Sequence, residues 1–185
     1  TGTAYGAYLL EFYNDSTDLV SVVDTAHFTS NNAANTWTKF AVTNRAPWSG
    51  NIQGRASATI LGNVTNFSGA VYFDALRLTA TNIPQSNTTC GAVSNPGFEY
   101  TAKGTQLKFV DNWTALGNAG DVQDTYARTG NKSLHFYFTE TLVSQDWPAT
   151  GLYRYAQSAY AFTPSTDRFS GASDHLAVLV MQFYN

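Results

Sequence analysis

The stretch Val71-Tyr72-Phe73-Asp74-Ala75-Leu76-Arg77-Leu78 alternates apolar and polar side chains, and it predicts a β-strand over residues 70–79. The alternation changes phase at Asp74-Ala75, because Val71 and Phe73 share one phase whereas Leu76 and Leu78 share the other. One extra residue in a strand, a β-bulge, produces such a change. The stretch therefore predicts a half-buried strand with a bulge in its middle.

The rest of the chain shows the same period of two and almost no helical periodicity. Residues 133–139 place Leu134, Phe136 and Phe138 on one face, and residues 176–184 place Ala177, Leu179, Met181 and Phe183 on one face. Short runs bounded by Gly, Asn, Pro and Ser are typical of an all-β sandwich or barrel. Further strands are expected at 19–23, 36–42, 56–61, 107–109 and 152–162.

Composition excludes several classes of protein. Apolar residues make up 43% and aromatic residues 15% of the 185 residues, which argues against disorder. The net charge is −3 with no cluster of Lys and Arg along the chain, so nucleic acid is not an expected partner, and no run of apolar residues is long enough to span a membrane. Charged residues are only 12%, with Ser, Thr, Asn and Gly abundant, which favours an extracellular β-protein.

The two ends of the chain nearly repeat each other. Leu10-Glu11-Phe12-Tyr13-Asn14 recurs as Met181-Gln182-Phe183-Tyr184-Asn185 with the same alternation, so both copies fit the same place in a sheet. A self-similarity at a fixed offset indicates a repeat. Residues 81–91 lack periodicity and are predicted to be a linker between residues 1–80 and residues 92–185.

The order of the motifs resembles a known family in which the two halves are exchanged. Asn95-Pro96-Gly97-Phe98-Glu99, Trp113 and Gly130-Asn131-Lys132-Ser133-Leu134 resemble the first half of the galactose-binding-like β-jelly-roll, shared by many carbohydrate-binding modules. Asn35-Thr36-Trp37-Thr38-Lys39-Phe40 and Val71-Tyr72-Phe73-Asp74 resemble its second half. The resemblance implies a jelly-roll β-sandwich in which 1–80 is a C-terminal half and 92–185 an N-terminal half, of the same or a neighbouring unit.

The exchanged order leaves three interpretations open. The chain is one repeat of a tandem array cut in mid-domain, a unit whose strand completes the next copy, or a circular permutant that folds alone. A segment that fills a neighbour's sheet pairs through its main chain, and such head-to-tail contacts build filaments. Residues Leu10, Phe12, Tyr13, Met181, Phe183 and Tyr184 are the candidate assembly strands, with further copies of this chain as partners.

Aromatic side chains are the candidate sugar-binding groups, because pyranose rings stack on exposed aromatic faces. Trp48 and Trp147 adjoin Pro47 and Pro148 and are expected in loops, as ligand or interface residues. Tyr153 and Tyr155 alternate on one strand and are further candidates, whereas Trp37 and Trp113 are expected to be structural. The alternative to ligand binding is packing in the core or against a neighbouring unit.

A structural calcium ion is the one cofactor that the resemblance implies. Asp74 and Glu99, with the backbone near Lys132, are the expected ligands, and calcium takes six to eight oxygen ligands. The alternative is a pair of surface carboxylates. The two acids lie on opposite sides of the predicted linker, so they meet only where both halves share a sandwich.

The sequence also contains candidate modification sites, a single cysteine and no catalytic pattern. Sequons begin at Asn14, Asn63, Asn66, Asn87, Asn112 and Asn131 and are candidate N-glycosylation sites. The single cysteine, Cys90, pairs outside this stretch or is a lone thiol. No pattern of histidines or carboxylates marks a catalytic centre.

The leading functional hypothesis is an extracellular, non-catalytic structural or adhesive repeat that forms a filament or surface polymer. The alternative is a carbohydrate-binding module that serves a polysaccharide-degrading enzyme. Exposed aromatic residues on one face of the sandwich favour the second hypothesis, and their burial between units favours the first.

Overall fold

The computed structural model describes residues 24–29, 31–45, 51–61, 69–81, 88–89, 93–101, 104–106, 110–116, 120–137, 142–150, 153–169 and 176–184. In these ranges the protein is almost entirely β-structure, with one short 3-10 turn, η3 (Ser165–Asp167), and its named strands pair antiparallel in two packed sheets. The predicted all-β sandwich is confirmed. The described part of the chain holds no helix that is long and apolar enough to cross a membrane.

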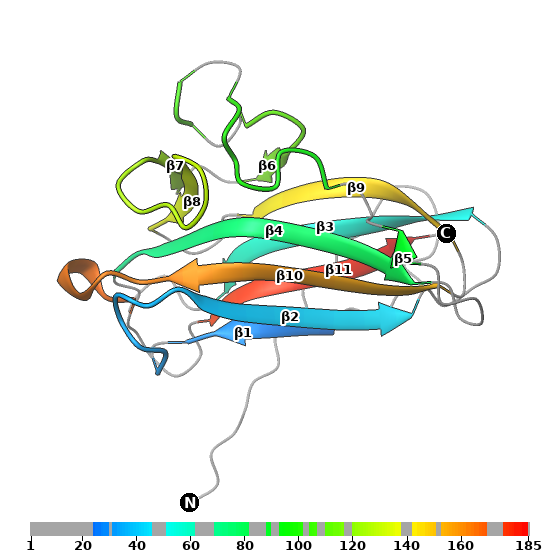
Figure 1. Cartoon of the computed structure of the whole chain (residues 1–185), viewed down its shortest axis with the longest axis horizontal. Helices are drawn as coiled ribbons and strands as arrows, with labels where there is room; N and C mark the ends of the chain where they lie inside the picture. The colour runs from blue at the N-terminus through cyan, green and yellow to red at the C-terminus, as the bar shows by residue number, and fades with distance from the viewer. Residues whose placement is uncertain are drawn as a thin grey trace, which may run out of the picture.

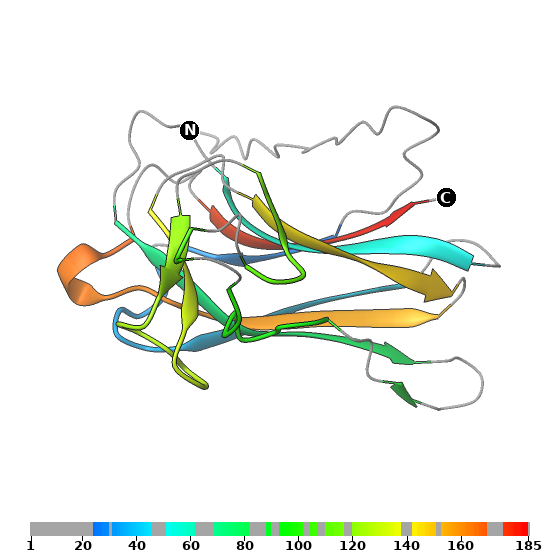
Figure 2. The same cartoon turned by 90° about the horizontal axis from the view of Figure 1, so that it is seen from above.

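The two sheets lie one behind the other in Figure 1 and form separate layers in Figure 2. Sheet A has the strand order β1 (Asp24–Phe28), β11 (Leu176–Tyr184), β3 (Asn51–Leu61), β9 (Leu142–Thr150) and β6 (Thr114–Leu116). Sheet B has the order β2 (Thr38–Arg45), β10 (Arg154–Phe162), β4 (Val71–Thr81), β8 (Ser133–Phe136) and β7 (Gly120–Gln123), and the short β5 (Thr88–Thr89) also pairs with β4.

Strands from before and after the predicted linker are interleaved in both sheets. In sheet A, β3 lies between β11 and β9, and in sheet B, β10 lies between β2 and β4. Within the predicted linker, β4 extends to Thr81 and β5 covers Thr88–Thr89. Both stretches of the chain therefore contribute to one sandwich, which brings residues near 74 close to residues near 99 and 130.

The core fills the space between the sheets with side chains of the expected phases. Leu134 and Phe136 are fully buried, whereas His135 is half-buried and Tyr137 is exposed, as the alternation predicts. On β11 the side chains of Ala177, Leu179 and Met181 are all buried in the core, and Trp113 joins the same cluster. Burial of this apolar surface is the main force that holds the two sheets together.

The bulge expected in β4 is confirmed. Ser158 of β10 pairs with Arg77, but Tyr160 pairs with Asp74, so β4 carries one residue more than β10 between these pairs. The extra residue allows Ala75 to adopt a φ of 52°, in the left-handed region. As a result Phe73 and Leu76 both enter the core despite their odd spacing.

The predicted strands agree with the structure in most places. The bounds of β11 are as expected, and β2, β3, β4 and β10 overlap their predicted ranges, whereas β8 ends at Phe136. Residues 8–14, 19–23, 107–109 and 138–139 lie outside the described residues. Strands β1, β5, β6, β7 and β9 were not predicted. Strand β9 was missed because it contains Pro148, which is unfavourable in a central strand. Proline is tolerated at this position because β6 pairs only with residues 142–144, so that among the described strands Pro148 has a neighbour on one side only, β3.

Candidate functional site

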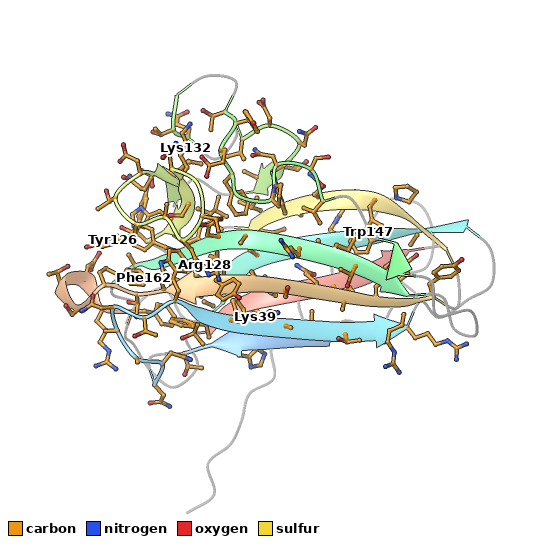
Figure 3. All side chains as sticks on the ribbon, viewed as in Figure 1. Lys39, Tyr126, Arg128, Lys132, Trp147 and Phe162 are labelled. Atoms are coloured by element: carbon orange, nitrogen blue, oxygen red, sulfur yellow. The ribbon has the colours of Figure 1, made fainter. Side chains whose placement is uncertain are left out.

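The outer face of sheet B carries a cluster of aromatic side chains that we call the aromatic surface. Tyr72 of β4 and Phe162 of β10 form its floor and are 7% and 6% exposed. Trp37, from the loop before β2, and Tyr126, from the loop between β7 and β8, pack against them and are half-buried. Figure 3 shows Tyr126 and Phe162 at the same end of the sheet. The surface therefore combines a buried base with aromatic rings that keep contact with solvent.

Ring contacts fix the positions of these side chains. The Trp37 and Phe162 ring centroids are 5.2 Å apart, and those of Tyr126 and Phe162 are 4.9 Å apart. Tyr72 packs edge-on against Tyr126 with 5.0 Å between the ring centroids. Aromatic pairs in these arrangements contribute about 0.5–1.5 kcal/mol beyond the area that they bury. The rings of the aromatic surface are thus held in place by one another.

A polar row borders the aromatic surface on its β8 and β7 side. His135 stacks on Tyr72 with 4.5 Å between the ring centroids, and its Nδ1 lies 2.7 Å from Asp121 Oδ1. Gln123 donates a hydrogen bond of 2.6 Å to Asp121 Oδ2. Burial, and then the neighbouring Tyr126, raises the pKa of Tyr72 to about 12, so its hydroxyl stays protonated at neutral pH. The row can offer hydrogen bonds at the edge of a stacking surface.

Arg128 extends the aromatic surface along β10. Its guanidinium carbon lies 3.4 Å from the centroid of the Tyr160 ring, a cation–π contact, and its side chain is exposed. Asp74 accepts the backbone N–H of Arg128 at 2.8 Å, which holds the loop over the sheet. Lys39 lies beside Tyr160 on the neighbouring strand, where the two residues are register partners. Figure 3 shows Lys39 and Arg128 near Phe162.

Three of the four predicted sugar-binding aromatics lie outside the aromatic surface. Trp147 is in β9, not in the expected loop, and is 6% exposed, whereas Tyr155 is 4% exposed and lies in the same core. Tyr153 packs against that core and is half-buried. None of these three rings lies in the aromatic surface. Trp48 lies outside the described residues, Trp113 is in the core as expected, and Trp37 contributes to the aromatic surface.

The two carboxylates of the expected calcium site converge on one turn. The Asp74 side chain is fully buried in the bulge and accepts backbone N–H groups from Ala75, Arg128 and Thr129. Glu99 accepts the backbone N–H groups of Asn131 and Lys132, so Lys132 takes part through its main chain.

Glycines leave space beside these acids. A Cβ added to Gly97 would lie 3.5 Å from Glu99 Oε1 and 3.6 Å from Asp74 Oδ1, and a Cβ at Gly130 would overlap Glu99 Oε1. Carboxylate oxygens are the ligands that calcium prefers, but those of Asp74 already accept three backbone N–H groups, and calcium at this pair stays a prediction. The described residues contain no group of three or more His, Cys, Asp or Glu side chains suited to a metal, so main-chain carbonyls or water would supply the other ligands.

Backbone geometry in the same region explains the Asn95–Glu99 motif. Asn95 has a φ of 51°, and its side-chain Nδ2 donates hydrogen bonds to the backbone oxygens of Tyr100 and Asp111. The Asn95 carbonyl accepts the indole N–H of Trp113 at 3.1 Å. This turn is thereby tied to the core and positions Glu99 toward the loop after β7.

The remaining predicted sites are only partly described. Asn112 and Asn131 have exposed side chains, as glycosylation requires, but modification itself stays a prediction. Among the candidate assembly residues, Met181 is buried in β11, and Phe183 and Tyr184 belong to the same strand. The others, with Cys90, lie outside the described residues: Asn14, Asn63, Asn66, Asn87, Leu10, Phe12 and Tyr13.

Sequence reasoning missed the aromatic surface although one signal was present. Tyr72 and Tyr160 alternate with core residues on their strands and so belong to the outer face of sheet B. Tyr126 and Arg128 come from a loop, where no periodicity indicates which way a side chain points. Comparison of the chain with protein-family models and with curated protein sequences finds no match.

Proposed function

We propose that this chain is an extracellular, non-catalytic carbohydrate-binding sandwich of the galactose-binding-like type. The aromatic surface is the observation that supports this proposal most directly. Trp37 and Tyr126 are only half-buried there, against the buried Tyr72 and Phe162 at one end of the sheet. Sugar rings bind to such faces by stacking, and the neighbouring polar side chains then fix their orientation.

Binding to polysaccharides tests the proposal. We expect Trp37→Ala and Tyr126→Ala to weaken polysaccharide binding, measured by affinity electrophoresis or calorimetry, by about tenfold or more. Tyr100→Ala is the matched control, because Tyr100 is 69% exposed and does not belong to the aromatic surface. Equal binding by all three variants would contradict the proposal, and release of reducing ends from the polysaccharide would contradict its non-catalytic part.

A calcium ion at Asp74 and Glu99 belongs to the same proposal. These acids link β4 to the turn before β6 and to the loop before β8, so an ion there would hold the loop that carries Tyr126 and Arg128. Its role would be structural, because neither acid lies in the aromatic surface.

A head-to-tail filament or tandem array is the second candidate function. The observation that favours it is the sequence repeat, because residues 10–14 match the end of β11. In the structure β11 fills its own place between β1 and β3, so residues 10–14 of one chain would take this place in a neighbouring unit only by displacing its β11. Deletion of residues 1–15 is then expected to shorten polymers seen by light scattering and electron microscopy. A full-length chain that remains a monomer of about 20 kDa would exclude the filament.

A further inference from the structure

The outer face of sheet B gathers basic side chains that are scattered in the sequence. Lys39 of β2, Arg77 of β4 and Arg154 of β10 are all exposed. Their register partners show that they share one face, because Lys39 pairs with the outward Tyr160 and Arg77 pairs with the outward Ser158. Arg128 adds a fourth charge over Tyr160. We call these four residues the basic face.

The described residues of β2, β4 and β10 include no exposed acidic side chain. Among the described residues of β2, β4 and β10, the only acid is Asp74, which is fully buried and accepts hydrogen bonds from the backbone. The nearest described acids lie at the aromatic end of the sheet, where Asp121 contacts His135 and where both Asp121 and Asp167 are close enough to Tyr72 to raise its pKa. The chain as a whole has a net charge of −3, so this face differs in sign from the rest of the protein.

The surface between the charges is open to a ligand. Arg45 lies directly opposite Arg154 in the ladder between β10 and β2, which places one more exposed basic residue beside the basic face. Between the basic residues the outward side chains are small, namely Ala41, Thr43, Thr79, Ala156 and Ser158. A chain-like ligand could therefore lie across the sheet without meeting bulky groups. Sheet A, by contrast, places Arg55 against Asp146 in a bidentate ion pair.

From this arrangement we infer that the ligand of sheet B is an acidic polysaccharide, and the inference rests on the carbohydrate-binding function proposed above. Stacking at the aromatic surface would hold a sugar ring, while Arg128, Lys39, Arg77 and Arg154 bind the carboxylate or sulfate groups along the chain. Guanidinium groups suit this role because they pair with planar oxyanions in a bidentate manner. The sequence pI of about 5.4 is unlike that of a typical nucleic-acid-binding domain.

The test compares matched oligosaccharides by isothermal titration calorimetry. Oligogalacturonides and neutral galacto-oligosaccharides of equal length differ in their carboxylates, and sulfated galactan oligosaccharides test the second anion. We expect the acidic ligands to bind at least about tenfold more tightly than the neutral ligand, with affinity falling as salt is added. The double variant Arg77→Gln/Arg154→Gln is expected to lose this preference while its binding of the neutral ligand stays unchanged.

A control with the same change in net charge separates a local effect from a general one. Arg55→Gln removes one positive charge from sheet A and is expected to keep the preference, whereas Arg77→Gln, with the same change in net charge, is expected to weaken it. Equal affinity for acidic and neutral ligands would overturn the inference and leave the proposed function intact. Absence of binding to every saccharide would overturn both. Tighter binding of single-stranded DNA than of oligogalacturonide would assign the basic face to nucleic acid and also overturn the inference.

Discussion

The Asp74 carboxylate accepts the backbone N–H of Thr129 at 2.8 Å, which joins a bulge in β4 to a loop that lies 55 residues later in the chain. The same carboxylate accepts the backbone N–H of Arg128, whose side chain covers Tyr160. A buried acid in the first part of the sequence thus positions residues of the aromatic surface that come from the second part. Asp74 pairs with the outward Tyr160 and so keeps the outward phase of Tyr72, while the extra residue of the bulge follows it in β4.

Removal of the Asp74 carboxylate should destabilise the fold. Asp74→Ala leaves the backbone N–H groups of Ala75, Arg128 and Thr129 without their acceptor, and we expect a loss of about 3 kcal/mol in the free energy of unfolding. Chemical denaturation monitored by tryptophan fluorescence measures it. Asp124→Ala removes an exposed carboxylate nearby and should change stability little. Equal losses in the two variants would show that the Asp74 hydrogen bonds contribute nothing specific.

Asp74 should also make stability depend on pH in an unusual direction. Burial raises the pKa of Asp74, against the opposing effect of its N–H donors, so ionisation costs more in the folded than in the unfolded state. The stabilising contribution is complete below the unfolded pKa and is lost as the pH rises through the folded pKa. The unfolding free energy of the wild type minus that of Asp74→Asn should therefore decrease, and can become negative, as the pH rises from about 3 to about 7. A difference that grows with pH would contradict this.

Calcium provides a separate test of the carboxylate pair. If an ion binds between Asp74 and Glu99, added calcium should raise the melting temperature of the wild type, and chelation should reverse the change. Glu99→Gln should abolish the response, whereas Asp121→Asn, on the far edge of sheet B, should retain it. An unchanged melting temperature at millimolar calcium would mean that the hydrogen bonds alone stabilise this turn.

The elements predicted best from the sequence are those whose side chains alternate cleanly. Strand β11 has its expected bounds, and the change of phase at Asp74-Ala75 is enough by itself to locate the bulge. Such predictions succeed because the period of two reports directly which side chains face the core. Strand β9 was not predicted because Pro148 has no N–H to donate to a neighbouring strand, which makes proline unfavourable in a central strand.

The candidate site was harder to predict because its residues meet only through the topology. Tyr126 and Arg128 belong to a loop, and Lys39, Arg77 and Arg154 lie on three strands that are neighbours only in the folded sheet. The alternation of Tyr72 with Val71 and Phe73 indicates an outward side chain, but it does not indicate which loop residues pack against that side chain. The prediction for Trp147 was wrong, because its position beside a proline suggested a loop although its ring is buried.

The packing of Trp147 against Gly54 gives a last prediction. The two residues are register partners on β9 and β3, and a Cβ added to Gly54 would overlap the indole ring. Because Trp147 is buried against Tyr155, its ring cannot move without disturbing the core, and we expect Gly54→Ala to cost about 2 kcal/mol. Thermal or chemical denaturation measures this loss.

Gly104→Ala is the control, because nothing lies within 4 Å of an added Cβ and only its backbone conformation opposes the change. A double-mutant cycle with Trp147→Leu should show coupling, since the smaller side chain leaves room for the new methyl group. Strictly additive losses would show that the tryptophan does not require glycine opposite it.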